Sequence, residues 1–348
     1  MSLTVSIEKR CGDFRLNVDI STGSGRPLAL LGASGCGKSL TLKCIAGIER
    51  PGRGYIELDG RVLFDSGARV NLPPQKRRVG LLFQQYALFP HMTVEENLAV
   101  CLRGLEPGRR RQRLGELLAR LRLEEQRKLY PRQLSGGQQQ RTALARILAS
   151  EPQAILLDEP LSALDSFLRW QLEGELREAL EQFPGPVVWV THDLGEARRN
   201  CRQVCVLDGG RSAPVTDLET LMRNPGTAAA ARLSGCKNLV PVRPGGAPGT
   251  VEVPDWGLTL RCAAPWRAEA AALGLRGVRP AEEGEIDNVF LCQVLRVTED
   301  LDSLQAALRP QGAAPGSPPL WMELSKGTPP PAGLLRVRVS PADLLLLE

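Results

Sequence analysis

The stretch with the clearest chemistry is "GASGCGKS" at residues 32–39, which fits the pattern G-x-x-x-x-G-K-[ST]. Glycines let the backbone approach a ligand closely, and the backbone N–H groups of such a loop surround phosphate oxygens. In this pattern Lys38 reaches the β- and γ-phosphates, and the Ser39 hydroxyl ligates magnesium. The stretch therefore predicts a nucleotide site made by Gly32, Ser34, Gly35, Cys36, Gly37, Lys38, Ser39 and Leu40.

Cys36 lies inside this loop, between Gly35 and Gly37, where added bulk would block the phosphates. A position at the N-terminus of a helix lowers the pKa of a thiol. We therefore expect a reactive Cys36, whose modification by maleimides inactivates the protein and is slowed by bound nucleotide.

An acidic pair follows the apolar run in "AILLDEP". Asp158 is placed to hold the magnesium, and Glu159 to polarise the attacking water as a general base. Such a pair after a strand also suits the cap of the next helix. The phosphate loop makes the catalytic interpretation the better one.

His192, in "VTHD", is one of two histidines and also follows a buried strand. A lone histidine is more often structural, but this one shares its strand end with the other two motifs, where it would contact the γ-phosphate and hold the water. In "LLFQQYALFP", the Gln84 amide would reach the magnesium or the water, and Gln85 is the competing candidate. The predicted metal ligands are Ser39, Gln84 and Asp158.

A second candidate anion site is "LSGGQQQR" at residues 134–141, directly before the helix-like "TALARILAS". A helix N-terminus presents unpaired N–H groups with a partial positive charge, which suits phosphate. The alternative is that Ser135 merely caps the helix. The residues alone do not explain why one chain would need two phosphate sites.

Short apolar runs must position these residues. The runs "LALLG", "AILLDEP" and "VVWVTHD" are typical of buried parallel strands in an α/β sheet, whose carboxyl ends carry ligands. Alternating apolar residues at 5–7 and 14–20 predict two strands joined at "CGD", and the stretch 92–150 is largely helical. A turn at "DGG" (208–210) and a helix near 218–234 follow.

The composition changes after about residue 238. Residues 239–348 hold 14 of the 27 prolines, and apolar runs there become short and strand-like. With 10 Lys and Arg against 13 Asp and Glu, this part carries a formal charge of −3. Since the whole chain carries +5, residues 1–238 carry +8. We expect two domains, 1–238 and 239–348, the second a small β-barrel or sandwich.

The 348-residue chain is 24% charged and 43% hydrophobic, as in ordinary globular proteins. No apolar run approaches the roughly 20 residues that cross a bilayer, and the first residues do not resemble a signal peptide, so we expect a cytosolic location. The nine scattered cysteines contain no C-x-x-C pair, which favours reduced thiols. Basic clusters at 75–78 and 108–113 are interpreted as solvated faces without nucleic-acid binding, because few aromatic residues accompany them.

In their order, these motifs resemble the ATP-binding subunits of ABC transporters over residues 1–238. The resemblance depends on six motifs, which are the phosphate loop, Gln84, "LSGGQ" (134–138), the Asp158–Glu159 pair, "SALD" (162–165) with Asp165, and His192. It implies ATP and Mg²⁺ as ligands and a homodimer in which two subunits pair head to tail. Ser135, Gly136, Gly137 and Gln138 then bind ATP held by the phosphate loop of the opposite subunit, which explains the second phosphate site.

The resemblance also places an aromatic ring against adenine, for which Phe14 is the matching position. Residues 86–97, "YALFPHMTVEEN", lie where the family docks its membrane permease subunits. Tyr86, Phe89 and Pro90 would suit that contact, and a role in the core is an equal alternative. The implied location is peripheral, on the cytoplasmic side of the membrane.

Much of the detail is similar to ATPases of molybdate and related oxyanion importers, including "RCGDFRLNVDI" and "DGRVLFDSGARVNLPPQKRRVGLLFQQYALFPH". "DNVFLCQVLRVTED" resembles the start of the small OB-like β-barrel that these importers append. The implied fold is an α/β P-loop NTPase domain with a helical subdomain, then an all-β regulatory or dimerisation module. The alternatives to a molybdate importer are importers of polyamines, sugars, sulfate or iron. Two further alternatives are a soluble regulatory ATPase and an oxyanion-binding module with a vestigial ATPase. An extracytoplasmic solute-binding protein is an indirect partner.

The C-terminal part departs from molybdate-binding relatives, which often begin with Ser-x-Arg-Asn. The matching stretches are "GCKN" (235–238) and "EIDN" (285–288), and the second puts Glu285 and Asp287 where Ser and Arg would stand. Carboxylates repel an oxyanion. We therefore expect a structural, dimer-supporting module and not a tight molybdate sensor.

Overall fold

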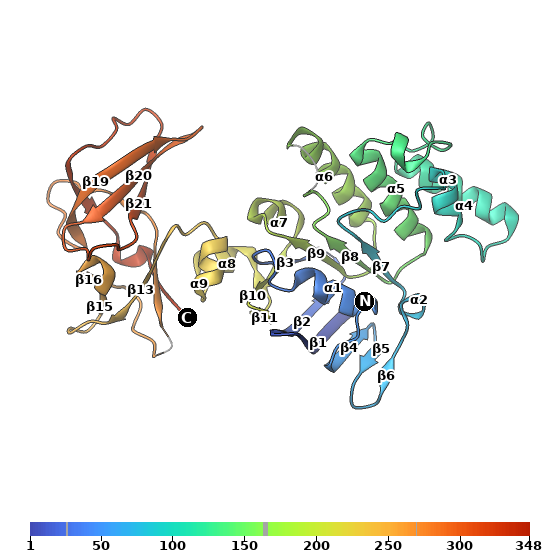
Figure 1. Cartoon of the computed structure of the whole chain (residues 1–348), viewed down its shortest axis with the longest axis horizontal. Helices are drawn as coiled ribbons and strands as arrows, with labels where there is room; N and C mark the ends of the chain where they lie inside the picture. Colours follow the sequence, from blue (N-terminus) through green and yellow to red (C-terminus); the bar gives the residue numbers. More distant parts are fainter. Residues whose placement is uncertain (26, 163–165, 269) are drawn as a thin grey trace. The chain divides into compact units, whose positions relative to one another are not determined.

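The computed structural model describes residues 1–25, 27–162, 166–268 and 270–348, which form two compact units, Met1–Leu218 and Glu219–Glu348. Figure 1 shows the first as a sheet flanked by helices and the second as mostly strands. The fold class expected from the sequence is confirmed.

Five parallel strands build the centre of the first unit, in the order β10-β3-β9-β8-β7. Every residue of β3, β8 and β9 is buried, as the three apolar runs predict. Because the strands are parallel, their carboxyl ends lie along one edge of the sheet. The bounds are β3 (Leu28–Leu31), β7 (Val79–Leu82), β8 (Ala154–Asp158), β9 (Val187–Thr191) and β10 (Gln203–Asp208).

An antiparallel part continues the same sheet through short strand β11 (Arg211–Ser212), which pairs with β2. Strand β1 (Ser2–Cys11) turns at Gly12 into β2 (Phe14–Gly23), with φ +61° at the glycine. Their apolar residues alternate inward, as their spacing predicts. The other strands are β4 (Arg53–Leu58), β5 (Arg61–Asp65), β6 (Val70–Asn71) and β12 (Thr216–Asp217).

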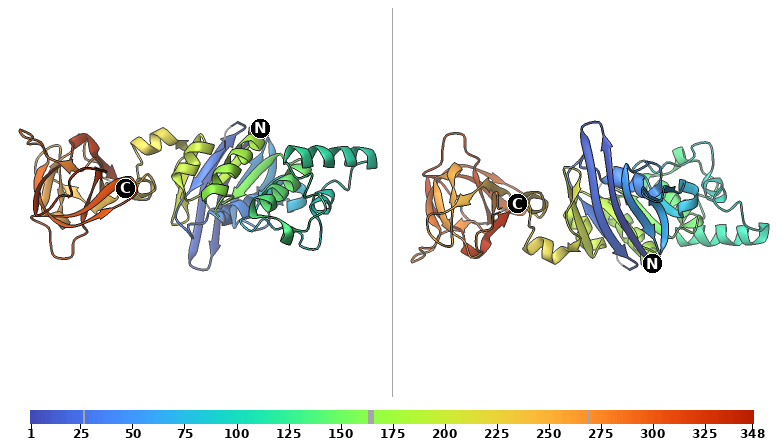
Figure 2. Two further views of the ribbon diagram at one scale, coloured as in Figure 1. Left: turned by 90° about the horizontal axis from the view of Figure 1, so that it is seen from above. Right: turned by 90° about the horizontal axis from the view of Figure 1, so that it is seen from below.

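The helices of the first unit divide into those next to the sheet and a helical part between β7 and β8. Figure 2 shows α4 projecting from this helical part. Next to the sheet are α1 (Lys38–Ala46), α2 (Pro74–Arg77), α6 (Ser166–Glu181) and α7 (Leu194–Asn200). The helical part holds α3 (Val94–Ala99), α4 (Pro107–Arg120), a 3₁₀ turn at Pro131–Gln133 and α5 (Gly136–Ala149), inside the predicted range.

One member of the basic cluster 75–78 is not a solvated side chain. Arg77 is 0% exposed, and its guanidinium donates to the carbonyl oxygens of Cys44 and Ile45, each at 2.8 Å. It also donates to Leu72 O at 2.8 Å and Asn71 Oδ1 at 2.9 Å. The interpretation as a solvated face is wrong here, because carbonyls at the end of α1, where helical N–H partners run out, make this buried site suitable for a cation.

The second unit is an antiparallel β-structure around one core that contains Trp256. Its sheets are β13-β17-β23, β14-β15-β16 and β18-β22-β19-β20-β21, which wrap into a barrel-like body in Figure 2. The strands are β13 (Asn238–Pro241), β14 (Arg243–Pro244), β15 (Thr250–Val253), β16 (Leu258–Arg261), β17 (Ala272–Leu275), β18 (Arg279–Pro280), β19 (Val289–Glu299), β20 (Ser303–Pro310), β21 (Leu320–Ser325), β22 (Leu334–Arg338) and β23 (Leu344–Leu347). Short 3₁₀ turns lie at Pro254–Trp256 and Pro341–Asp343.

The boundary between the units differs from the one drawn from composition at residue 238. Helix α8 (Leu218–Arg223) stands at the division, and α9 (Ala228–Leu233) lies within the second unit. Ala231 and Cys236 pack with Leu347 in a small apolar cluster. The Ala228 N–H also donates to Glu348 O at 3.1 Å. Composition missed this because the end of the chain returns to hold a helix that precedes the proline-rich part.

Candidate nucleotide-binding and catalytic site

The phosphate loop joins β3 to α1, and its shape requires glycine at two positions. Gly37 has φ +108°, and a Cβ there would lie 2.6 Å from Leu16 Cδ1. A Cβ at Gly32 would lie 2.3 Å from the carbonyl oxygen of Leu207. Both distances are too short for a side chain, so the loop packs closely on the sheet and leaves its N–H groups for a ligand.

Lys38 begins α1 and lies across this loop. Its ammonium donates to Gly32 O at 2.8 Å and to Ala33 O at 2.9 Å, and the residue is buried. The ammonium is therefore held over the loop, where it can bind phosphate oxygens.

Cys36 has an environment opposite to the one expected. The thiol is buried 3.9 Å from Lys38 Nζ, and burial raises its pKa, with the nearby Lys38 charge opposing this effect. The prediction of a lowered pKa is wrong, because loss of solvent outweighs the positive charge at the helix start. The other eight cysteines are also free thiols.

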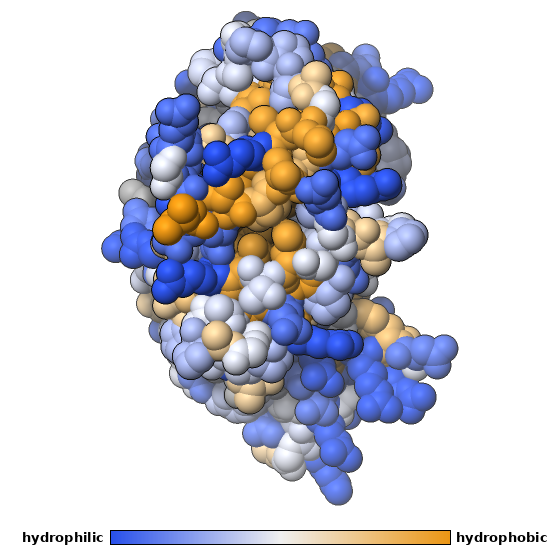
Figure 3. Space-filling model, turned by 90° about the vertical axis from the view of Figure 1, so that its left-hand side faces the viewer, coloured by the Kyte–Doolittle hydropathy of each residue, from blue (hydrophilic) through white to orange (hydrophobic). Residues whose placement is uncertain are grey.

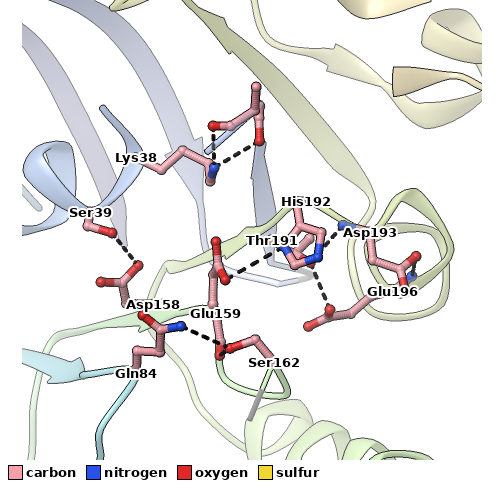
Figure 4. Close-up of polar contacts among 12 residues, drawn as sticks. Lys38, Ser39, Gln84, Asp158, Glu159, Ser162, Thr191, His192, Asp193 and Glu196 are labelled. Atoms are coloured by element: carbon pink, nitrogen blue, oxygen red, sulfur yellow. Dashed lines mark hydrogen bonds and ion pairs between the residues drawn. The ribbon is translucent and has the colours of Figure 1, made fainter. Parts of the chain in front are cut away.

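Asp158, the last residue of β8, faces the start of α1. Its Oδ1 accepts the Ser39 hydroxyl at 2.8 Å, as Figure 4 shows. Burial raises the pKa of Asp158, the Ser39 hydrogen bond lowers it, and the neighbouring Glu159 raises it. A carboxylate and a hydroxyl that meet beside the phosphate loop are hard oxygen donors of the kind magnesium prefers, so these two residues fit this metal.

Glu159 stands at the end of β8 beside His192. Its backbone has φ +46°, and its N–H donates to Val190 O at 3.1 Å, which turns the chain out of the sheet. The side chain is 23% exposed, and Oε2 lies 3.6 Å from Nδ1 of His192, which is 62% exposed. A carboxylate and an imidazole thus meet at the open end of adjacent strands (Figure 4).

Gln84 approaches the loop after Glu159 from β7. Its Nε2 lies 3.4 Å from Ser162 Oγ, which in turn donates to Glu159 O at 3.0 Å. Among the described residues, Gln84 and not Gln85 makes a side-chain hydrogen bond to this loop. The contact favours Gln84 over its neighbour.

The signature residues lie at the N-terminus of α5. Ser135 Oγ accepts the Gln138 N–H at 3.3 Å, and Gln138 Oε1 accepts the Ser135 N–H at 2.9 Å. This reciprocal pair is a capping box, so the helix-cap alternative describes a real feature of Ser135. Gly136 and Gly137 follow in the first turn. Asp165, the remaining predicted nucleotide contact, lies outside the described residues.

Comparison with known proteins agrees with this geometry. Residues 16–162 match the family model described as ABC transporter. The chain is 39% identical over 307 residues to "Spermidine/putrescine import ATP-binding protein PotA" of Rubrobacter xylanophilus, covering 87% of this chain and 78% of that protein. The chain belongs to the ABC transporter family. Its first unit is the ATP-hydrolysing domain of that family.

Two further comparisons extend this result. "Molybdenum import ATP-binding protein ModC" of Paramagnetospirillum magneticum is 39% identical over 224 residues, which cover 64% of this chain and 61% of that protein. The ATP-binding cassette MJ0796, solved as a post-hydrolysis dimer bound to ADP and Pi, matches with a TM-score of 0.53 and 31% identity. That match covers 63% of this chain and 99% of the cassette.

Phe14, the predicted adenine contact of this ABC ATPase, lies directly beside the phosphate loop. Its Cζ would be 3.1 Å from a Cβ at Gly37 and 3.1 Å from one at Gly210. The ring is half-buried against the first unit's core. The structure thus places the ring edge next to the loop.

The aromatic residues before α3 have two different environments, one in the core and one on the surface. Tyr86 is buried, whereas Phe89 and Pro90 are exposed. Arg146 lies over the Phe89 ring, 5.2 Å from its centroid. Buried Asn97 holds this segment by donating to Phe89 O at 3.2 Å and accepting the Phe89 N–H at 2.9 Å. Tyr86 is therefore a core residue, and Phe89 and Pro90 remain available for a partner.

The motifs in the sequence do not predict the role of the residues beneath His192. Glu196 Oε2 accepts the Thr191 hydroxyl and Oε1 accepts the Trp189 indole N–H, each at 2.7 Å. The available signal was the spacing of Asp193 and Glu196, which matches a capping residue and an acidic residue three positions later.

The carboxylates expected to repel an oxyanion in the second unit are not free. Glu285 pairs with both Arg279 and Arg338, and these contacts, first of all the hydrogen bond from Arg279, lower its pKa. Asp287 Oδ1 lies 2.9 Å from Nη1 of Arg261. The prediction that these carboxylates would repel an oxyanion without compensation is therefore wrong. Strands earlier and later in the chain supply the arginines that pair with them.

Proposed function

We propose that this ATPase supplies the energy for an importer of molybdate or a related oxyanion, by hydrolysing Mg·ATP between two copies of the chain. The observation that carries the catalytic part is the meeting of Lys38, Ser39, Asp158, Glu159 and His192 at one edge of the parallel sheet. The similarity to ModC supports the oxyanion.

In the proposed reaction, the phosphate loop and Lys38 bind the phosphates of ATP. Ser39 and Asp158 would hold Mg²⁺, which would supply positive charge to neutralise the phosphates, and Gln84, whose Nε2 lies 3.4 Å from Ser162 Oγ in the loop after Glu159, would contribute. Glu159 accepts the proton of the attacking water, and His192 holds the γ-phosphate and the water in line.

The signature residues serve the opposite subunit in this proposal. The Ser135 side chain makes its hydrogen bond within the first turn of α5. The backbone N–H groups of Gly136 and Gly137 in that turn would bind a phosphate. The post-hydrolysis cassette MJ0796 is itself dimeric. A head-to-tail homodimer would place this surface on the ATP of the partner and bury Phe14 against adenine.

The energy would be delivered to separate permease subunits through Phe89 and Pro90. In the described parts of the chain, no helix is long and apolar enough to cross a membrane. The proposed location is therefore peripheral, on the cytoplasmic side, with an extracytoplasmic solute-binding protein as an indirect partner.

The second unit is proposed to support the dimer. Its exposed large hydrophobic side chains include Ile286, Leu301 and Leu334, which are 86%, 83% and 64% exposed. Figure 3 shows hydrophobic side chains gathered on one face among hydrophilic ones. A patch of this kind is typical of protein contacts.

A polyamine is the competing solute, because the match to PotA extends over 87% of this chain. Uptake of labelled molybdate and of labelled spermidine by the native host, with and without the gene for this chain, distinguishes the two. We expect loss of molybdate uptake that the wild-type chain restores and a Lys38→Ala chain does not. Loss of spermidine uptake alone would replace the oxyanion by a polyamine.

A further inference from the structure

A ring of hydrogen bonds encloses the backbone on both sides of His192. Thr191 ends β9, and Asp193 is the capping residue of α7. The Asp193 N–H donates to Thr191 Oγ1, and Asp193 Oδ1 accepts the Glu196 N–H, each at 3.1 Å. The His192 side chain projects from this ring and is directed to Glu159 (Figure 4).

Glu196 closes the ring from the buried side. It is 5% exposed, and its two carboxylate oxygens accept the Thr191 hydroxyl and the Trp189 indole N–H. Burial raises the pKa of Glu196, and both hydrogen bonds oppose that effect. Each carboxylate oxygen of Glu196 thus accepts a short hydrogen bond from a buried donor.

The Thr191 hydroxyl transmits the orientation of Glu196 to the loop. A hydroxyl has one proton, and here that proton goes to Glu196 Oε2. The oxygen lone pairs then face the Asp193 N–H, which they accept. Fixing the carboxylate therefore fixes the residues immediately before and after His192.

We propose that Glu196 is a positioning residue for ATP hydrolysis, which acts through Thr191 to hold the His192 imidazole beside Glu159. Glu196 does not touch the nucleotide in this role. The inference rests on the proposed function of His192. Because a reacting group displaced by about 1 Å can slow a reaction about a hundredfold, a buried clamp on this loop affects turnover more than binding.

Glu173 of α6 provides a matched comparison. It is also 5% exposed, and it accepts Arg199 Nε at 2.7 Å, Arg199 Nη2 at 3.0 Å and Asn200 Nδ2 at 2.7 Å. These hydrogen bonds join α6 to the end of α7, and none of them goes to Thr191, His192 or Asp193. The link toward Glu196 passes through Asn200, whose Nδ2 also donates to the Glu196 carbonyl at 2.9 Å and not to its carboxylate. Glu173→Gln therefore measures the cost of losing a buried carboxylate while the Glu196–Thr191 contact is kept.

The test measures kcat, the KM for Mg·ATP and the melting temperature of full-length variants. Thr191→Val keeps the shape and removes the hydroxyl, Thr191→Ser returns it, and Glu196→Met removes both acceptors. We expect Thr191→Val and Glu196→Met to lower kcat about tenfold or more with KM within about twofold, Thr191→Ser to restore kcat, and Glu173→Gln to lower the melting temperature without that loss.

His192→Ala separates the role of His192 in hydrolysis from the positioning role of Glu196. Wild-type turnover in Thr191→Val, with turnover lost in His192→Ala, would overturn the positioning role alone. Equal losses of kcat and of melting temperature in Thr191→Val and Glu173→Gln would also overturn it. Wild-type turnover in His192→Ala would overturn the role of His192 and this inference together. If Glu196→Met fails to fold, the two threonine variants decide the question.

Discussion

The two units treat their charged side chains differently. In the first, Glu159 and His192 end at an open strand edge, and their contacts to one another leave part of each side chain accessible. In the second, Glu285 and Asp287 are taken up by Arg279, Arg338 and Arg261. A charge that the fold positions without fully pairing is available for chemistry, whereas a charge paired internally mainly holds strands together.

The strongest test of this contrast is Glu159→Gln. The amide keeps the shape and removes the base, so we expect turnover to fall about a hundredfold or more while ATP still binds. The variant should accumulate as an ATP-bound dimer on size exclusion. Glu151→Gln is the matched control, since Glu151 also has φ +46° and is exposed. Wild-type turnover in Glu159→Gln would remove Glu159 from the mechanism.

The next test separates the phosphate loop from the signature. Lys38→Ala and Ser135→Arg should each abolish the ATPase activity of a homodimer, because each destroys both composite sites. A mixed dimer of the two variants keeps one intact site and should recover a measurable part of the activity. Normal hydrolysis by Ser135→Arg alone would refute the arrangement across subunits.

Arg77 sharpens the contrast, because it is a first-unit cation in which every guanidinium nitrogen donates a hydrogen bond. Arg77→Met would remove the guanidinium donor of the Ile45 carbonyl and leave the Cys44 carbonyl with only the Gly47 N–H at 3.2 Å, so it should cost about 2–4 kcal/mol of unfolding free energy. Differential scanning calorimetry should show a lower melting temperature, whereas Lys76→Met on the exposed side should not. An unchanged melting temperature for Arg77→Met would show that the carbonyls find other partners.

The thiol of Cys36 should react slowly with maleimide. Since its pKa is raised by burial, the reactive thiolate fraction at neutral pH is small and grows as pH rises. The rate of inactivation should therefore increase with pH, and bound ATP should slow it. Exposed Cys11 should be labelled first without loss of activity. Undiminished inactivation of Cys36→Ala would assign the effect to another cysteine.

The smallest effect is expected in the second unit. The cations at the two candidate stretches already bind carboxylates of the same chain, including Lys237, whose Nζ lies 3.7 Å from Glu323 Oε2. Calorimetric titration of the full chain with molybdate and tungstate should show no saturable binding at low micromolar concentration. Using the Lys38→Ala chain excludes binding at the phosphate loop. Saturable binding there would restore the regulatory interpretation.

The sequence predicts the nucleotide edge well because its motifs are local. Three apolar runs, each followed by its polar residues, are enough to bring Lys38, Asp158 and His192 to one side of a parallel sheet. What it does not predict depends on distant partners. Arg77 is buried by carbonyls of α1, Cys36 loses solvent through packing, and the arginines around Glu285 come from other strands. A charge pattern along the chain does not contain these contacts.

Strand β3 lies between β9 and β10, which a ribosome makes long after it. Until about residue 191 has emerged, four consecutive apolar residues at 28–31 lack both of their neighbours in the sheet, and until about residue 208 they still lack β10. Nascent chains that stop earlier expose this strand, and unpaired apolar strands promote aggregation. The loop that binds ATP is thus among the first segments synthesised and among the last to be completed, so nucleotide binding can serve as a late checkpoint of correct folding.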